Sequence, residues 1–325
     1  MQIRNSEECI LSYFFYAHFS IFKGINLPSI IMKNLLILLS ILFFFSCTTE
    51  KKREVSTETP IAELEKTRSL TMLWETDTVL TTCESVLYDR KNDVLYVANI
   101  GEVPPDAKDN DGFISKLSSN GEILDLKWIE GIDAPKGMGL IGDKLVVTNI
   151  DEVVEIDISS GTISKRIPVE GAKFLNDITV ATDGTVYVSD NRSNKIYSLK
   201  NGEVSIWLEK EDFGGPNGLL SQGDKLMAVT FGSGSFMNIT TGDQTIRELA
   251  GGLKGGDGIA AVGENYLVSS WNGEIYFVDQ AGSTTKLLDT KAEKINAADI
   301  DYIEDKNMLL VPTFFGNKVV AYRLD

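Results

Sequence analysis

Six residues occupy one recurring position of this chain and form its best candidate for a chemical site. They are Glu84, Lys136, Asn176, Asn217, Asp257 and Ala298. Four of the six carry a side-chain oxygen, and none is a histidine or cysteine. Carboxylate and amide oxygens are ligands that hard divalent cations prefer, and two carboxylates balance two positive charges. The pattern therefore predicts a metal site made of Glu84, Asn176, Asn217 and Asp257, with Ca²⁺ as the first choice and Mg²⁺ or Zn²⁺ as alternatives.

A second interpretation of these residues needs no metal. Asn217 and Asp257 each precede a glycine, and Asn-Gly and Asp-Gly pairs often form turns. A single pair of this kind would be assigned to a turn. Oxygen-bearing residues in the same register of four repeats favour a site instead.

The repeat that sets this register predicts four short strands per unit. In one unit the apolar strand Asp177–Ala181 is followed by a Gly/Asp turn and the strand Thr185–Ser189, and then by Lys195–Leu199 and Glu203–Leu208. The recurring position returns every 40 or 41 residues, except for one interval of 52. An insertion rich in Pro, Asp and Asn, Gly101–Gly112, explains the longer interval. Four antiparallel strands in each of six such units predict an all-β fold, a six-bladed β-propeller; a stacked β-solenoid is the competing architecture.

The ends of the repeat region predict how the ring closes. The sixth unit stops after three strands, at Arg323, and an extra strand, Thr71–Glu75, precedes the first unit. This N-terminal strand is expected to complete the last blade and remove an open sheet edge. Residues 68–325 therefore form a single propeller domain.

The first strand of a blade is the innermost, so the six recurring residues are expected to converge on one mouth of the central channel. The loop between strands two and three lies on the same face, which adds Asn99, Phe231 and Phe314 as rim residues. Trp271 and the phenylalanines are expected to form an apolar wall, although any one of them is also explained as an exposed loop residue. The predicted substrate-binding residues are Asn176, Lys136, Trp271, Asn149 and Asp190.

The N-terminal region resembles a processing signal. Met32-Lys33-Asn34 precedes the apolar run Leu35–Phe45, and the ending up to Cys47 resembles a bacterial lipobox. We therefore expect translation from Met32, a signal region over residues 1–46, a lipid on Cys47 and a tether over residues 47–67. The protein would be exported and lipid-anchored to the bacterial cell envelope, facing the periplasm. The alternative is an apolar anchor that is not cleaved.

Composition excludes several classes of function. The formal net charge is −16 without a visible basic patch, which excludes nucleic acid as a partner. The single histidine, His18, lies in the predicted signal region, so catalysis that needs imidazole is excluded. Cys83 has no histidine to activate it and is interpreted as a packing residue. We expect a monomer that meets a small-molecule substrate or ligand.

The motifs at the recurring position resemble the regucalcin/gluconolactonase (SMP-30-like) family of six-bladed propellers. They are Glu84 before an apolar strand, Asn176-Asp177, Pro216-Asn217-Gly218-Leu219 and Asp257-Gly258. The resemblance covers the whole propeller. It implies a divalent cation held by Glu84, Asn217 and Asp257, with Asn176 beside it and touching the substrate. It also implies that Asp257 is a catalytic general base in hydrolysis of a sugar lactone or similar cyclic ester.

Two positions depart from the pattern of that family. Phe174 stands where family lactonases have an arginine that grips the sugar acid, and Ser85 stands where they have glycine. Three functions therefore remain in competition. The first is a metal-dependent lactonase or esterase, and the second a non-catalytic envelope propeller that binds a small ligand or protein. The third is a structural lipoprotein in which a cation only stabilises the ring.

Overall fold

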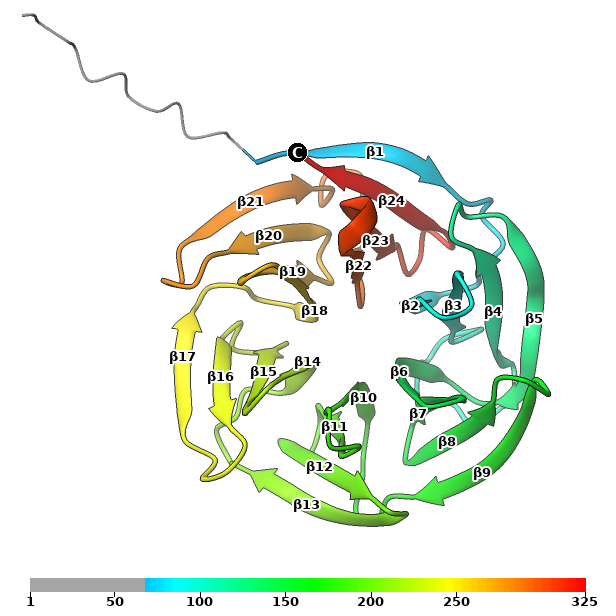
Figure 1. The fold of residues 1–325 in the computed structure, drawn as a ribbon, viewed down its shortest axis with the longest axis horizontal. Coiled ribbons are helices and arrows are strands. Elements are labelled where there is room, and N and C mark those ends of the chain that lie inside the picture. The colour runs from blue at the N-terminus through cyan, green and yellow to red at the C-terminus, as the bar shows by residue number, and fades with distance from the viewer. Residues whose placement is uncertain (1–67) are drawn as a thin grey trace, which may run out of the picture. The chain divides into compact units, whose positions relative to one another are not determined.

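The computed structural model describes residues 68–325, which form a ring of six four-stranded antiparallel sheets (Figure 1). The predicted six-bladed propeller is confirmed, and the solenoid is excluded. The predicted signal region, Cys47 and the whole of the tether lie outside the described residues. Within residues 68–325, no helix has the length and apolar character needed to span a membrane.

Blades one to five run from the inner strand outward in chain order, and blade six does so for its first three strands before β1 completes it. Blade one contains β2 (Cys83–Asp89), β3 (Val94–Asn99), β4 (Gly112–Ser118) and β5 (Ile123–Ile132). Blade two contains β6 (Pro135–Ile141), β7 (Lys144–Asn149), β8 (Glu152–Asp157) and β9 (Thr162–Pro168). Blade three contains β10 (Leu175–Val180), β11 (Val186–Asp190), β12 (Lys195–Lys200) and β13 (Glu203–Glu209).

The remaining blades follow the same plan. Blade four contains β14 (Pro216–Gln222), β15 (Lys225–Thr230), β16 (Phe236–Thr240) and β17 (Ile246–Ala250). Blade five contains β18 (Gly256–Val262), β19 (Asn265–Ser270), β20 (Glu274–Val278) and β21 (Thr284–Asp289). Blade six contains β22 (Asp301–Ile303), the short 3₁₀ helix η1 (Glu304–Lys306), β23 (Met308–Pro312), β24 (Val319–Leu324) and β1 (Leu70–Glu75).

The N-terminal strand closes the ring, as predicted. β1 pairs antiparallel with β24, its first residue Leu70 opposite Leu324, and Figure 1 shows the two strands side by side at the outer edge of blade six. The strand begins at Leu70, one residue earlier than predicted. Buried residues of blade one, such as Leu95 and Val97, pack in one cluster with Leu310 and Val319 of blade six. We call the β1–β24 pair and the contact between blades one and six the closing seam. It combines a hydrogen-bonded strand pair with an apolar core.

The burial of each strand follows from its place between two neighbouring sheets. Every residue of β3 is buried, because both of its faces are covered by adjacent blades. The outer strand β9 is instead mostly exposed, and only Ile163 and Ile167 of its residues are at least half-buried. The second strands therefore carry the apolar runs of fully covered strands, and the outer strands are polar on their exposed side.

In blades one to five the recurring position lies inside the inner strand, not just before it as the sequence indicated, whereas Ala298 of blade six precedes β22 as predicted. In β2, β6, β10, β14 and β18 the pairing register shifts near the second residue of the strand. That residue is Glu84, Lys136, Asn176, Asn217 or Asp257. A β-bulge of this kind interrupts the ladder and re-aims a side chain. The same local irregularity thus repeats at each of the five positions.

The glycines that follow some of these residues serve close packing between blades. A Cβ atom on Gly218 would lie 2.0 Å from the carbonyl oxygen of Asp257, and one on Gly137 would lie 2.5 Å from Cα of Asp177. Only glycine permits this approach of neighbouring inner strands. The turn interpretation of the Asn-Gly and Asp-Gly pairs is therefore wrong, because these pairs lie within strands.

Truncation at the closing seam should cost much more stability than truncation at the ring's surface. Leu310 is fully buried in the seam, so Leu310→Ala is expected to lower the free energy of unfolding by about 2–5 kcal/mol. Leu124 on β5 is 55% exposed and supplies the matched control Leu124→Ala, with an expected change within about 0.5 kcal/mol. Urea unfolding of both variants measures the difference, and equal losses would contradict the role of the seam.

Candidate functional site

A pocket of about 330 Å³ opens where the inner strands begin. Its lining contains the four predicted metal ligands, Glu84, Asn176, Asn217 and Asp257, together with Lys136. Each of these five residues is buried, with at most 7% of its surface exposed. Residues that are 40 or more positions apart in the chain therefore line the same pocket, because each occupies the second position of an inner strand.

Two oxygens in this pocket have no hydrogen-bond partner. Nδ2 of Asn217 donates to Oδ1 of Asp257 at 3.1 Å and to the carbonyl oxygen of Gly256 at 3.3 Å. This orientation leaves Oδ1 of Asn217 unpaired, and Oε2 of Glu84 is also buried and unpaired. Buried polar atoms nearly always have partners, so two unpaired oxygens in one pocket call for an explanation.

Burial and neighbouring negative charges disfavour the charged forms of the two carboxyls. Burial is the main cause that raises the pKa of Glu84 well above its ordinary value, and the charge of Asp257 adds to it. Burial likewise raises the pKa of Asp257, with a further contribution from the charge of Asp177. Lys136 opposes the shift at Glu84. A positive charge bound between these carboxyls would relieve the cost of holding both ionised.

The number of acidic ligands at this site is small. Within residues 68–325, no group of three or more His, Cys, Asp or Glu side chains is arranged to hold a metal ion. The predicted donor set does not need such a group, because half of its oxygens come from the amides of Asn176 and Asn217. Amide and carbonyl oxygens are ordinary Ca²⁺ ligands.

Lys136 is buried and makes its polar contacts with the backbone. Its Nζ donates to the carbonyl oxygens of Pro105 at 3.0 Å and Ala134 at 3.1 Å. It also lies 4.4 Å from the ring centroid of Phe174. Burial lowers the pKa of Lys136 to about 8, although the charge of Glu84 opposes that shift. The predicted substrate-binding lysine thus lines the pocket while it ties the insertion to blade two.

The insertion Gly101–Gly112 forms part of the pocket wall, which the sequence did not indicate. Val103 and Pro105 from this segment line the pocket. Asp106 forms an ion pair with Arg192 of blade three, and Lys108 pairs with Asp151 at 2.7 Å. These contacts hold the insertion against the two neighbouring blades.

Aromatic side chains form another part of the pocket lining. Trp271 meets Phe314 and Phe315 edge to face, with ring centroids 5.5 and 5.9 Å away. Phe174 and Phe231 also line the pocket. The predicted apolar wall of Trp271, Phe231 and Phe314 is therefore present in the lining. Phe315 was missed, and its position directly after Phe314 was the available signal.

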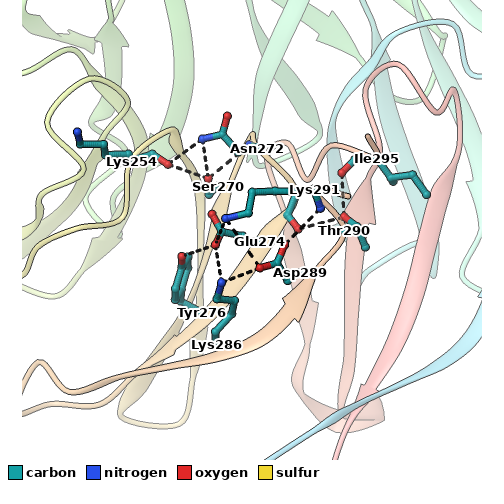
Figure 2. Close-up of polar contacts among 11 residues, drawn as sticks. Lys254, Ser270, Asn272, Glu274, Tyr276, Lys286, Asp289, Thr290, Lys291 and Ile295 are labelled. Atoms are coloured by element: carbon teal, nitrogen blue, oxygen red, sulfur yellow. Dashed lines mark hydrogen bonds and ion pairs between the residues drawn. The ribbon is translucent and has the colours of Figure 1, made fainter. Parts of the chain in front are cut away.

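Polar contacts at the end of β19 hold the loop that carries Trp271 (Figure 2). Oγ of Ser270, the residue before Trp271, donates to the carbonyl oxygen of Lys254 at 2.8 Å. On the far side of the loop, Glu274 accepts a hydrogen bond from Nζ of Lys291 at 2.7 Å. The backbone N–H of Trp271 donates to Gly255 at 2.7 Å. The aromatic wall consequently rests on a loop tied at several points.

Two predicted substrate-binding residues do not line this pocket. Oδ1 of Asn149 accepts from the backbone N–H of Ala134 at 2.9 Å. The carboxylate of Asp190 accepts from the backbone N–H groups of Lys173 at 2.7 Å and Phe174 at 3.1 Å. Both side chains are buried and fix the segment that leads into an inner strand. Asp190 thereby positions Phe174 and the strand β10, which carries Asn176.

Cys83 is fully buried, and burial raises the pKa of its thiol to about 12. Its Sγ lies 3.2 Å from the carbonyl oxygen of Lys318, across the closing seam. A thiol in this state is a poor nucleophile. The residue packs in the seam cluster, in agreement with the prediction.

Comparisons with known proteins identify relatives by fold. No protein-family model matches the sequence, and no curated protein matches it. A gluconolactonase from Xanthomonas campestris has a TM-score of 0.59 at 15% identity, over 79% of this chain and 89% of that chain. A virginiamycin B lyase from Staphylococcus aureus, in complex with quinupristin, has a TM-score of 0.57 at 14% identity, over 79% and 99% of the two chains.

A protein of unknown function from Bacteroides thetaiotaomicron has a TM-score of 0.60 at 12% identity, over 79% of this chain and 76% of that chain. At these identities the similarity shows a shared fold. The chain is thus a six-bladed β-propeller whose structural neighbours include a gluconolactonase and a lyase.

Proposed function

We propose that this protein is a divalent-cation-dependent hydrolase that cleaves a lactone or similar small ester in the pocket at the channel mouth. One observation carries the proposal. Oε2 of Glu84 and Oδ1 of Asn217 are buried without partners in the same pocket as Asp257 and Asn176. Such oxygens are costly unless they bind something, and a cation is the simplest group that satisfies acceptors only.

The donor set fits a hard cation. Glu84, Asn176, Asn217 and Asp257 would hold it through oxygen alone, and solvent would complete the coordination. Ca²⁺ fits best because it accepts a mixed and irregular set of oxygen ligands, with Mg²⁺ and Zn²⁺ as alternatives. When bound, the cation would polarise a substrate carbonyl and lower the pKa of a nearby water molecule.

Asp257 is the proposed general base. Its Oδ1 accepts the Asn217 amide at 3.1 Å, which fixes the plane of the carboxylate and leaves Oδ2 to accept a proton. The water proton would move to Asp257 as the water oxygen attacks the carbonyl carbon. The same proton would then pass to the leaving alkoxide as the ring or ester C–O bond breaks.

The fold comparison supports a hydrolase more than a lyase. The similarity to a gluconolactonase agrees with hydrolysis of a cyclic ester. The structure of the lyase neighbour is that of a catalytically inactive variant, in which one histidine is replaced by alanine. Residues 68–325 of this chain contain no histidine, so an equivalent side chain is not present in the propeller.

The setting of the reaction is part of the same proposal. A lipid on Cys47 would anchor the propeller to the bacterial cell envelope as a monomer that faces the periplasm. The substrate would then be a small molecule that reaches this compartment, and nucleic acid would have no role.

A non-catalytic ligand-binding propeller is the second candidate, and the environment of Phe174 favours it. This phenylalanine holds the position of the arginine in the SMP-30-like pattern. Its ring lies 4.4 Å from Nζ of Lys136 and 4.2 Å from the guanidinium of Arg192. Both cations already have protein partners, Pro105 and Asp106 among them. Binding without turnover would support this candidate.

Removal of the proposed base should abolish turnover while the fold stays intact. Asp257→Asn is expected to lower kcat for a hydrolysed lactone by about 10²–10⁴-fold, the usual contribution of a positioned base. Asp143→Asn, which changes an exposed carboxylate on blade two, supplies the matched control. Steady-state hydrolysis of a lactone panel with Ca²⁺ measures both. Unchanged kcat in Asp257→Asn would remove Asp257 from the mechanism.

A divalent cation should stabilise the folded protein through the predicted ligands. At a Ca²⁺ concentration 100 times Kd, the expected gain in unfolding free energy is about 2.7 kcal/mol. Asn217→Ala, which deletes one unpaired oxygen, should reduce the rise in Tm, whereas Leu124→Ala should leave it unchanged. A cation titration followed by differential scanning calorimetry measures this, and an identical rise in Asn217→Ala would contradict the ligand assignment.

Without a cation, stability should fall as the pH rises above about 4, the ordinary carboxyl value. Glu84 and Asp257 have raised pKa values when folded, so in that range the folded state binds more protons than the unfolded state, and the unfolding free energy decreases with pH. Saturating Ca²⁺ should reduce this decline, and Asp257→Asn should remove only part of it, because Asp177, Asp299 and Asp301 also have raised pKa values. Urea unfolding between pH 4 and 8, with and without Ca²⁺ and at constant ionic strength, tests the prediction. Stability that increases with pH in the cation-free protein would be the opposite result.

A further inference from the structure

The polar side chains of the pocket lining are buried and are called its polar base here, while two of its aromatic rings are exposed. Trp271, Phe314 and Phe315 touch one another edge to face, and Phe174 and Phe231 belong to the same lining. Phe315 is 55% exposed and Phe231 is 40% exposed. In a chain with a net charge of −16, exposed aromatic rings gathered beside a pocket mark a surface that meets an apolar group.

The polar groups of the pocket are already committed. Asn217 bonds to Asp257, and the proposed function assigns these two residues, together with Glu84 and Asn176, to the cation. Lys136 donates to two backbone carbonyls, and Arg192 pairs with Asp106. Hydroxyl groups on the body of a ligand would therefore face aromatic rings without partners, and the loss of their hydration would oppose binding.

The size of the space limits the ligand to a small molecule. The pocket holds about 330 Å³, near the lower end of typical small-molecule sites. Val103, from the insertion, adds a further apolar contact and is 53% exposed. A ring with one aryl or short alkyl substituent matches this volume and this wall.

We propose that the substrate is a lactone or ester with an apolar body, aryl or alkyl, whose carbonyl group meets the polar base of the pocket while the body packs against Trp271, Phe314 and Phe315. A polyhydroxylated sugar lactone is the class that this wall disfavours. This inference rests on the proposed function for its reaction and adds the part of the substrate that is recognised.

The test compares matched substrates with a matched pair of variants. γ-Phenyl-γ-butyrolactone and glucono-δ-lactone are hydrolysed by the full chain with Ca²⁺, and the apolar lactone is expected to have a kcat/KM greater by at least about tenfold. Phe315→Ala should raise KM for the apolar lactone by roughly 3- to 10-fold and leave KM for gluconolactone unchanged. Leu124→Ala, equally exposed at 55% but on the outer strand β5, should change neither.

A preference for gluconolactone, or an equal effect of Phe315→Ala on both substrates, would overturn the inference. If neither lactone is hydrolysed, the proposed reaction fails and binding decides the inference separately. The probes are then the unreactive cyclic amides γ-phenyl-γ-butyrolactam and gluconolactam, titrated by calorimetry. Binding of the phenyl lactam alone, weakened by Phe315→Ala, would support an apolar site. Binding of gluconolactam alone, or of neither lactam, would refute it.

Discussion

The backbone pairing of β1 with β24 is the interaction on which the ring depends. Each blade buries its apolar faces only because it has a neighbour on both sides, and blades one and six gain that neighbour through closure. The seam adds an apolar cluster and a hydrogen bond from the N–H of Asp299 to the carbonyl oxygen of Glu84 at 2.9 Å. Closure consequently fixes the strand that carries the first acidic residue of the site, and a local break at the seam would reach the pocket directly.

Within the closed ring, five inner strands have the same bulge at the recurring position. This bulge allows close packing of neighbouring strands and also turns a side chain toward the pocket. The backbone around it lets neighbouring strands approach, as the glycines at 137, 218 and 258 show, while the side chain turns toward the pocket. Repeating this feature gathers polar groups in an apolar setting, which raises the pKa of both acids. Burial of these polar groups costs folding free energy. The six apolar clusters between neighbouring blades offset that cost.

Periodicity in the sequence was enough to predict the blade number, the strand order and the closing strand, because each repeats or terminates a regular pattern. It was also enough to bring Glu84, Asn176, Asn217 and Asp257 to one pocket. It did not distinguish Asn149 and Asp190, whose oxygens accept backbone N–H groups of the segment leading into the inner strand of their own blade, from residues that face the channel. Nor did it place the insertion or Phe315 in the wall, because these contacts join residues from different blades and have no periodic signature.

The closing seam also brings the two ends of the described chain together. The N–H of Asp325 donates to the carbonyl oxygen of Ser69 at 3.0 Å. A short linker across this gap, with new ends opened in a surface loop between other blades, would preserve every strand pair in a circular permutant. The blade at which the chain begins is thus separable from the order of the blades around the ring.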